Sequence, residues 1–219
     1  MLHKLDNFPH LQAIAALQCN SYVARVEDAL YRATTQVIAE VGWDGLTLDR
    51  VAELAGKSRV TLWRNGITRE SLLDGLLRQL ATDYRDVMLP VLVAVMTPRE
   101  RFEKTMYALC DVVDMHAQLL SVSDDMFHRA FAAGDVPLGF LDPFLQAIRE
   151  ARAAGELRGA GPSTARKPSG KPSAKEIEMA DIAFNATAWP YLHFRLRHRW
   201  TATRARRALV TTLLEGLLR

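Results

Sequence analysis

The chain has 219 residues, 49% hydrophobic and 24% charged, so it is long enough and apolar enough to bury a core. Its only two cysteines, Cys19 and Cys110, form no CxxC pair, which argues against a disulfide framework or a zinc ribbon. The formal net charge is only +3, and neither a signal peptide nor a membrane-spanning apolar run is visible. We therefore expect a soluble, cytoplasmic protein that does not bind a membrane.

The first part of the chain predicts a tail and one amphipathic helix. Residues 1–20 have a weak apolar pattern and are expected to form an N-terminal tail. Residues 21–41 carry apolar side chains at helical spacing, and Gly42 is suited to end that helix.

Residues 47–69, TLDRVAELAGKSRVTLWRNGITR, predict two short helices joined by a tight turn. Thr47 and Ser58 can cap them at their N-termini, and Gly56 can adopt the positive φ that such a turn requires. The segment from residue 54 to residue 69 has no acidic residue and four basic ones, namely Lys57, Arg59, Arg64 and Arg69. This arrangement is typical of a DNA-binding helix-turn-helix. The alternative is a solvated basic turn in an unrelated helical protein.

The rest of the chain predicts further helices and no strand. A long helix begins at residue 70, and Pro90 is expected to kink or end it. Thr97 and Glu100 form a capping-box pair, with Pro98 at the first helical position. Glycine, proline and serine dominate residues 159–174, which we expect to form a flexible loop. Apolar side chains at helical spacing predict the other helices at about residues 97–117, 124–132, 142–154, 175–197 and 201–218.

Between residues 25 and 77 the sequence is similar to the TetR family of transcriptional regulators. The resemblance rests on VGWDGLTLDRVAELAGKSRVTLWRNGITRESLLDGLL, and the remainder matches the family in helix count, length and order. It implies an all-α fold of about nine helices, with a three-helix DNA-binding head at residues 21–68. A ligand-binding and dimerisation domain would follow at residues 69–219. The pair Asn65-Gly66 departs from the family pattern and leaves an alternative open, a helical ligand-binding or interaction protein with a weakened DNA-reading head.

The helix-turn-helix supplies the candidate DNA-binding residues. At the start of the second helix, Arg59 could bind guanine O6 and N7, and Val60 could contact a thymine methyl group. The resemblance implies that Thr47, Trp63 and Arg69 contact the DNA backbone. The full candidate set is Thr47, Lys57, Ser58, Arg59, Val60, Thr61, Trp63, Arg64, Asn65 and Arg69.

The C-terminal helices suggest a homodimer and a ligand pocket. Broad apolar stripes on the last two helices predict a four-helix bundle between two copies, although they could instead pack on the chain's own core. Candidate interface residues are Phe184, Thr187, Tyr191, Leu209, Leu213 and Leu217. Candidate pocket residues are Tyr107, Met115, His116, Met126, Phe127, Phe131 and Trp189.

Together with these patterns, the resemblance to the TetR family implies a dimeric repressor that a small apolar or amphipathic effector releases from a palindromic DNA operator. We expect no cofactor, no metal site and no enzymatic activity, because no catalytic constellation is visible. His193 and His198 are five residues apart, which does not match a helical metal pair. The arginine-rich segment 195–207 is expected to be a solvated face, with a second binding surface as the alternative.

Overall fold

The computed structural model describes residues 28–121, 139–158 and 171–218. The predicted tail at residues 1–20 and the predicted helix at residues 124–132 lie outside them, as does most of the predicted loop 159–174. Contacts divide the chain into two compact units, Met1–Leu76 and Leu77–Arg219. The division lies beyond the boundary expected after residue 68, because the first residues of α4 (Arg69–Val93) belong to the first unit.

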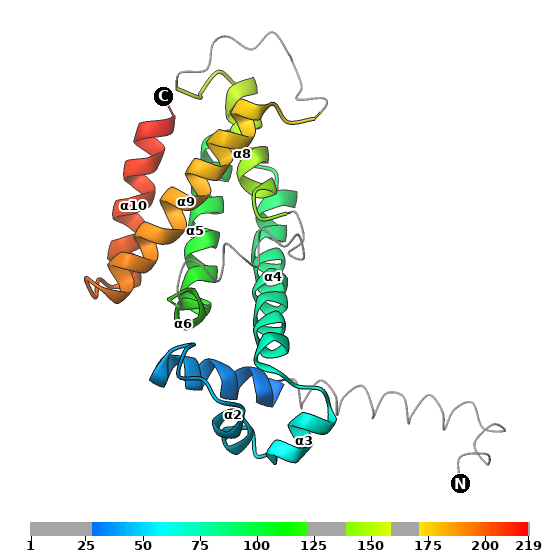
Figure 1. Ribbon diagram of the computed structural model, residues 1–219. Helices are drawn as coiled ribbons and strands as arrows, with labels where there is room; N and C mark the ends of the chain where they lie inside the picture. Colours follow the sequence, from blue (N-terminus) through cyan, green and yellow to red (C-terminus); the bar gives the residue numbers. More distant parts are fainter. Residues whose placement is uncertain (1–27, 122–138, 159–170, 219) are drawn as a thin grey trace, which may run out of the picture. The chain divides into compact units, whose positions relative to one another are not determined.

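The first unit is a small helical head. It contains a helix at residues 28–41, α2 (Leu48–Leu54), α3 (Arg59–Arg64) and the beginning of α4 (Figure 1). Helices α2 and α3 contact each other. Apolar side chains from all four helices and from the loop before α2 form its core, notably Leu30, Val37, Leu46, Val51, Leu62 and Leu72.

The second unit is a helical bundle. Its described residues form the rest of α4 and the helices α5 (Pro98–Met115), α6 (Ala117–Leu120), α8 (Asp142–Ala153), α9 (Ala174–Leu196) and α10 (Ala202–Leu217). Helix α5 contacts α8, α9 and α10, and its side chains Phe102, Met106, Leu109 and Val113 are buried. In the described ranges the regular elements are all helices, and Leu157 and Leu218 form an isolated bridge. The predicted all-α fold is confirmed.

Local capping signals agree with the helix starts. The predicted capping box at Thr97 and Glu100 is present, and Ser173 and Glu176 form a second one at the start of α9. Pro90 does not end α4, which continues to Val93, and α9 likewise continues past Pro190.

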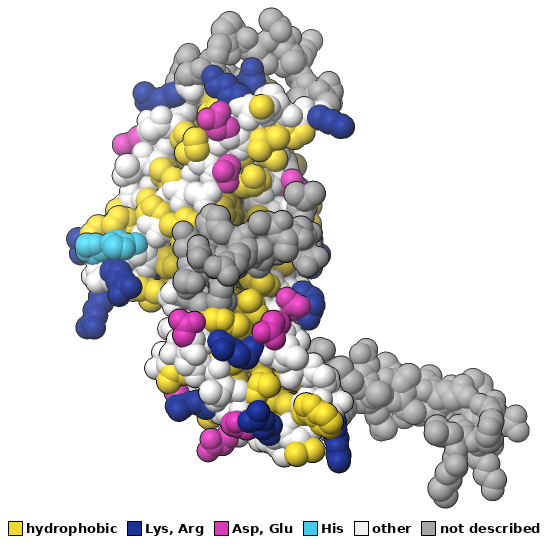
Figure 2. Space-filling view, in the orientation of Figure 1, with side chains coloured by type: hydrophobic (Ala, Val, Ile, Leu, Met, Phe, Trp, Pro, Cys, Tyr) yellow, Lys and Arg dark blue, Asp and Glu magenta, His cyan; other side chains and the backbone are white. Residues whose placement is uncertain are grey.

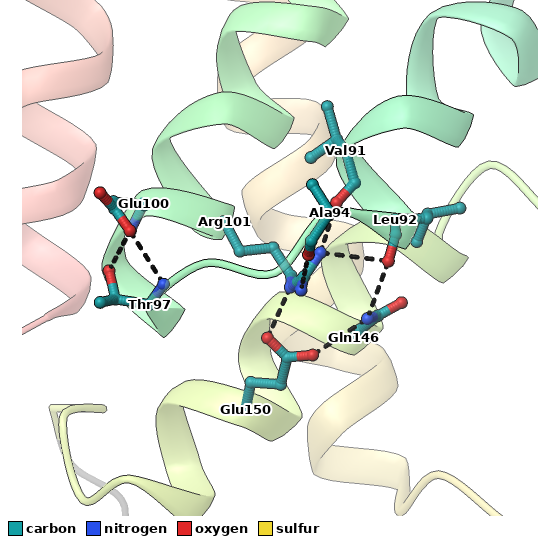
Figure 3. A network of polar contacts seen from close by, with 8 residues as sticks. All are labelled: Val91, Leu92, Ala94, Thr97, Glu100, Arg101, Gln146 and Glu150. Atoms are coloured by element: carbon teal, nitrogen blue, oxygen red, sulfur yellow. Dashed lines mark hydrogen bonds and ion pairs between the residues drawn. The ribbon is translucent and has the colours of Figure 1, made fainter.

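The end of α4 is joined to α5 and α8 by one buried arginine, Arg101 (Figure 3). Its guanidinium donates to the backbone oxygens of Val91, Leu92 and Ala94 and to the carboxylate of Glu150. The last carbonyls of a helix have no partner within that helix. Arg101 supplies those partners and ties three helices together.

Candidate nucleic-acid interface

The turn between α2 and α3 has the geometry expected for a helix-turn-helix. Gly56 lies just beyond α2 with φ 63°, and its N–H donates to the oxygen of Glu53 at 3.1 Å. The N–H of Lys57 donates to the oxygen of Ala52 at 2.8 Å. These two bonds form the glycine-ended helix terminus called a Schellman motif. A residue with a side chain would be strained at this φ, so the turn depends on Gly56.

Helix α3 is defined at both ends. Ser58 caps its start, with Oγ accepting from the N–H of Thr61 at 3.1 Å. Its end is a second Schellman motif, in which Gly66 (φ 67°) donates to Trp63 and Ile67 donates to Leu62 at 2.9 Å. Asn65 is the C-terminal cap, so it lies just beyond the helix. The Asn65-Gly66 pair therefore ends α3 in a defined geometry.

Helix α3 is anchored by one side chain and exposes the others. Leu62 is its only buried residue. Trp63 is 78% exposed and Val60 is 54% exposed, and residues three apart lie on one side of a helix. Arg59, Thr61 and Arg64 are also exposed. Basic, polar and apolar groups thus share an accessible helix surface of the kind that can enter a DNA groove.

An ion pair holds Arg59 in place. The Arg59 guanidinium is paired with the carboxylate of Asp49 in the first turn of α2. Sequence reasoning missed Asp49 because the pair exists only through the packing of α2 on α3. Both side chains are largely exposed, so Arg59 can exchange this partner at little cost.

Two other candidates have structural contacts within the head. Arg69 donates to the backbone oxygen of Trp43 at 2.6 Å, and its guanidinium lies 4.9 Å from the centroid of that ring. The hydroxyl of Thr47 accepts from the N–H of Arg50 at 3.4 Å, as predicted for an N-cap. Lys57 is half-buried. Arg69 therefore helps to fix the loop before α2, whatever else it contacts.

Four of the predicted pocket residues, Tyr107, Met115, His116 and Trp189, lie in the described part of the chain, and their surroundings differ. Met115 is 53% exposed. Tyr107 is near Arg206 and Arg207 of α10; burial raises its pKa, as does the charge of Glu103. His116 is buried, and its Nε2 lies 2.9 Å from Oδ2 of Asp83 on α4; burial lowers its pKa. Trp189 is half-buried and donates to Asn185. Met126, Phe127 and Phe131 are outside the described residues.

Two of the six predicted interface residues, Thr187 and Tyr191, are buried in the interior of the second unit. Thr187 is buried and donates to the oxygen of Ala183, and buried Tyr191 donates to Asp114 at 2.6 Å. Phe184 is half-buried and packs edge-on against Phe144. Their α9 face covers the chain's own core. Leu209, Leu213 and Leu217, by contrast, are half-buried along one side of α10.

Asp114 links α5 to α9 and α10. It accepts from Tyr191, from Arg195 at 2.8 Å and from Arg206 at 2.7 Å. Burial alone would raise the pKa of this carboxyl, but the three donors outweigh it and lower the pKa. Two arginines of the segment 195–207 therefore face inward, whereas Arg197, Arg199, Arg204 and Arg207 are exposed.

The described residues show neither a metal site of three or more ligands nor a membrane-spanning helix. Over residues 28–121, 139–158 and 171–218, no group of three or more His, Cys, Asp and Glu side chains is placed to hold a metal. No helix in the same ranges has the length and apolar character needed to cross a membrane.

No protein-family model and no curated protein sequence matches the chain. Several solved structures, however, match it over most of its length. KstR2, a ketosteroid transcriptional regulator of Mycobacterium tuberculosis, is 16% identical with a TM-score of 0.64, covering 88% of this chain and 95% of that one. AibR, solved with isovaleryl coenzyme A and operator DNA, is 15% identical with a TM-score of 0.59, covering 85% and 97%.

A Mesorhizobium loti protein assigned to the TetR family is 16% identical, with a TM-score of 0.58 over 90% of this chain and 98% of that one. Identities this low establish the fold and leave function to be argued from the site. The chain has the fold of the TetR-family transcriptional regulators.

Proposed function

We propose that the chain is a sequence-specific DNA-binding transcriptional regulator, acting as a dimeric repressor. The observation that carries the proposal is α3, a capped helix anchored by Leu62 alone that exposes Arg59, Val60, Thr61, Trp63 and Arg64. AibR, which shares the fold, is solved with operator DNA. The regulators that share the fold are not described as enzymes, and we propose no catalytic activity for this chain.

In this proposal the N-terminal end of α3 reads base edges in the major groove. Arg59 would leave Asp49 and bind guanine O6 and N7, a contact that discriminates by about 1–3 kcal/mol. Val60 would contact a thymine methyl group. Lys57, Trp63 and Arg64 would contact the backbone, which sets the register without reading sequence.

The alternative of a weakened reading head was motivated by Asn65-Gly66. That pair ends α3 with two backbone hydrogen bonds and a glycine in its favoured conformation. The termination leaves Arg59, Val60 and Thr61 in the helix, which favours the DNA-reading proposal.

The experiment for this proposal is a mobility shift with the chain's own upstream region and an unrelated duplex of equal length. We expect Arg59→Ala to lower the ratio of the two affinities by about 5–150-fold for each half-site, because loss of a bidentate base contact removes about 1–3 kcal/mol of discrimination. The matched control is Arg64→Ala, which should weaken both duplexes alike and reduce the salt slope by about one. Unchanged sequence preference in Arg59→Ala would contradict the assigned base contact.

The dimer is proposed from apolar surface on the last two helices. Leu209, Leu213 and Leu217 are half-buried at four-residue spacing on α10, and Ile182 of α9 is 57% exposed. A single head buries too little surface for tight specific binding, so two copies would be needed on a palindrome.

We expect Leu213→Glu to shift the protein from dimer to monomer in sedimentation velocity, because a carboxylate would be buried without a partner. Leu89→Glu, on an exposed site of α4, is the control and should leave the dimer intact. A wild-type protein that sediments as a monomer at micromolar concentration would refute the dimer.

The second unit is proposed to bind a small apolar or amphipathic ligand. KstR2 is a ketosteroid transcriptional regulator, and AibR is solved with isovaleryl coenzyme A; both have the same fold as this chain, which supports this class of effector. Within the described residues, the hydroxyl of Thr105 on α5 is fully buried without a hydrogen-bond partner. Release from DNA requires that the ligand bind more tightly to a DNA-incompetent form of the dimer.

A further inference from the structure

Two histidines meet at the turn between α9 and α10. Helix α9 ends at Leu196, and the chain turns through Arg199, whose φ is 53°. This turn brings His198 back onto α9, so that its Nε2 lies 3.1 Å from Nε2 of His193. On one continuous helix, side chains five residues apart would point about 140° apart around the axis. The spacing rule that excluded this pair does not apply, because His198 is beyond the helix.

The turn is held by several contacts. The rings of Phe194 and Trp200 stack with centroids 4.6 Å apart and planes 10° apart. Arg195 donates to the backbone oxygen of Trp200 at 2.7 Å, and the Arg204 guanidinium lies 4.0 Å from the Trp200 ring centroid. The two imidazoles are thus positioned before any ligand arrives, which lowers the entropic cost of binding.

We propose that His193 and His198 bind one divalent transition-metal ion through their Nε2 atoms. Metal–imidazole bonds are about 2.0–2.1 Å, so two nitrogens at 90–110° around one ion are about 2.9–3.4 Å apart. The observed 3.1 Å lies in this range. Without a metal the pair can share one Nε2–H···Nε2 hydrogen bond. On metal binding the donor imidazole carries its proton on Nδ1 instead, so that both Nε2 lone pairs are available to the ion and both rings stay neutral. Both side chains are exposed, and Figure 2 shows histidines at the surface over this turn.

The surroundings indicate which ion and which additional ligands fit. Imidazole suits Zn²⁺, Ni²⁺ and Cu²⁺, and affinity rises from Ni²⁺ to Cu²⁺. The described residues offer no third His, Cys, Asp or Glu ligand at this point, so water or an exogenous anion completes the coordination. Exposed Arg197 and Arg199 flank His198 and favour an anion as that further ligand.

The test uses the full chain without an affinity tag, with His3, His10 and His128 replaced by alanine to remove other imidazoles. Buried His116 stays in place. Titration with NiCl₂ in a calorimeter should give one ion per chain, and CuCl₂ should bind more tightly. His193→Ala and His198→Ala should each weaken Ni²⁺ binding at least tenfold, with the helical circular-dichroism spectrum unchanged.

Arg197→Ala is the matched control, since it removes an exposed neighbour that is no ligand, and it should bind Ni²⁺ as tightly as its parent or more tightly. Failure of the parent to bind Ni²⁺, or equal binding by the parent and both histidine variants, would overturn the proposal. Metal binding is measured without DNA, so its failure would not count against the proposed DNA-binding function, which the mobility shift tests separately.

Discussion

Replacing Arg101 by methionine should lower the free energy of unfolding of the second unit by about 3–5 kcal/mol, the cost of removing one partner from a buried ion pair. The variant leaves Glu150 without its guanidinium and the oxygens of Val91 and Ala94 without their side-chain donor, whereas the oxygen of Leu92 keeps only Gln146 at 3.4 Å (Figure 3). Methionine keeps most of the volume, so packing loss is a small part of the effect. Urea denaturation followed by circular dichroism measures this change in the free energy of unfolding.

The control for this variant is Arg99→Met, in the same turn of α5. Arg99 is exposed, and a surface substitution of this kind changes stability by about 0.5 kcal/mol or less. If the two variants unfold at the same urea concentration, the Arg101 network contributes nothing to the stability of the bundle.

The second large effect is expected from Leu62→Ala in the first unit. Leu62 is 2% exposed and is the only buried side chain of α3, so its truncation removes the anchor of that helix. The expected cost is about 2–5 kcal/mol, the range for a buried leucine. DNA affinity should fall with it, because a detached α3 must be ordered again before it can bind.

Hydrogen exchange shows which part of the chain the Leu62→Ala substitution destabilises, since it reports local opening separately for each amide. Faster exchange should be confined to the first unit. The comparison is Leu54→Ala, at a 43% exposed position at the end of α2, where we expect little change. Fast exchange spread equally over the second unit would show that the head does not unfold locally.

The parts of the fold that could be predicted are those set by neighbours in sequence. The cap at Ser58, the positive φ at Gly56 and the capping box at Thr97 each depend on residues within four positions, and all three are present. Helical periodicity likewise identified the long helices. Periodicity shows that a face is apolar but cannot show what covers it. For this reason Thr187 and Tyr191 were assigned to a dimer interface, whereas they lie in the core.

Contacts that depend on how the chain packs or turns beyond one helix could not be predicted from a single sequence. The pairing of Asp49 with Arg59 requires α2 to pack on α3, and the approach of His193 to His198 requires the turn after α9. Pro90 was expected to kink or end α4, and it does not end the helix, which runs on to Val93. Arg101, which belongs to α5, donates to carbonyl oxygens in the last turn of α4. Nothing in the sequence around Pro90 indicates that this arginine would lie there.

Selection from a random duplex library tests most directly whether α3 reads a DNA sequence. Repeated binding and amplification with the full protein at physiological salt should enrich one palindromic site, with half-sites about one helical turn or slightly more apart. We expect the enriched site to bind about 10³-fold or more tightly than the starting library. A library that stays unenriched, bound equally at every sequence or not at all, would contradict the proposal that α3 reads a DNA sequence.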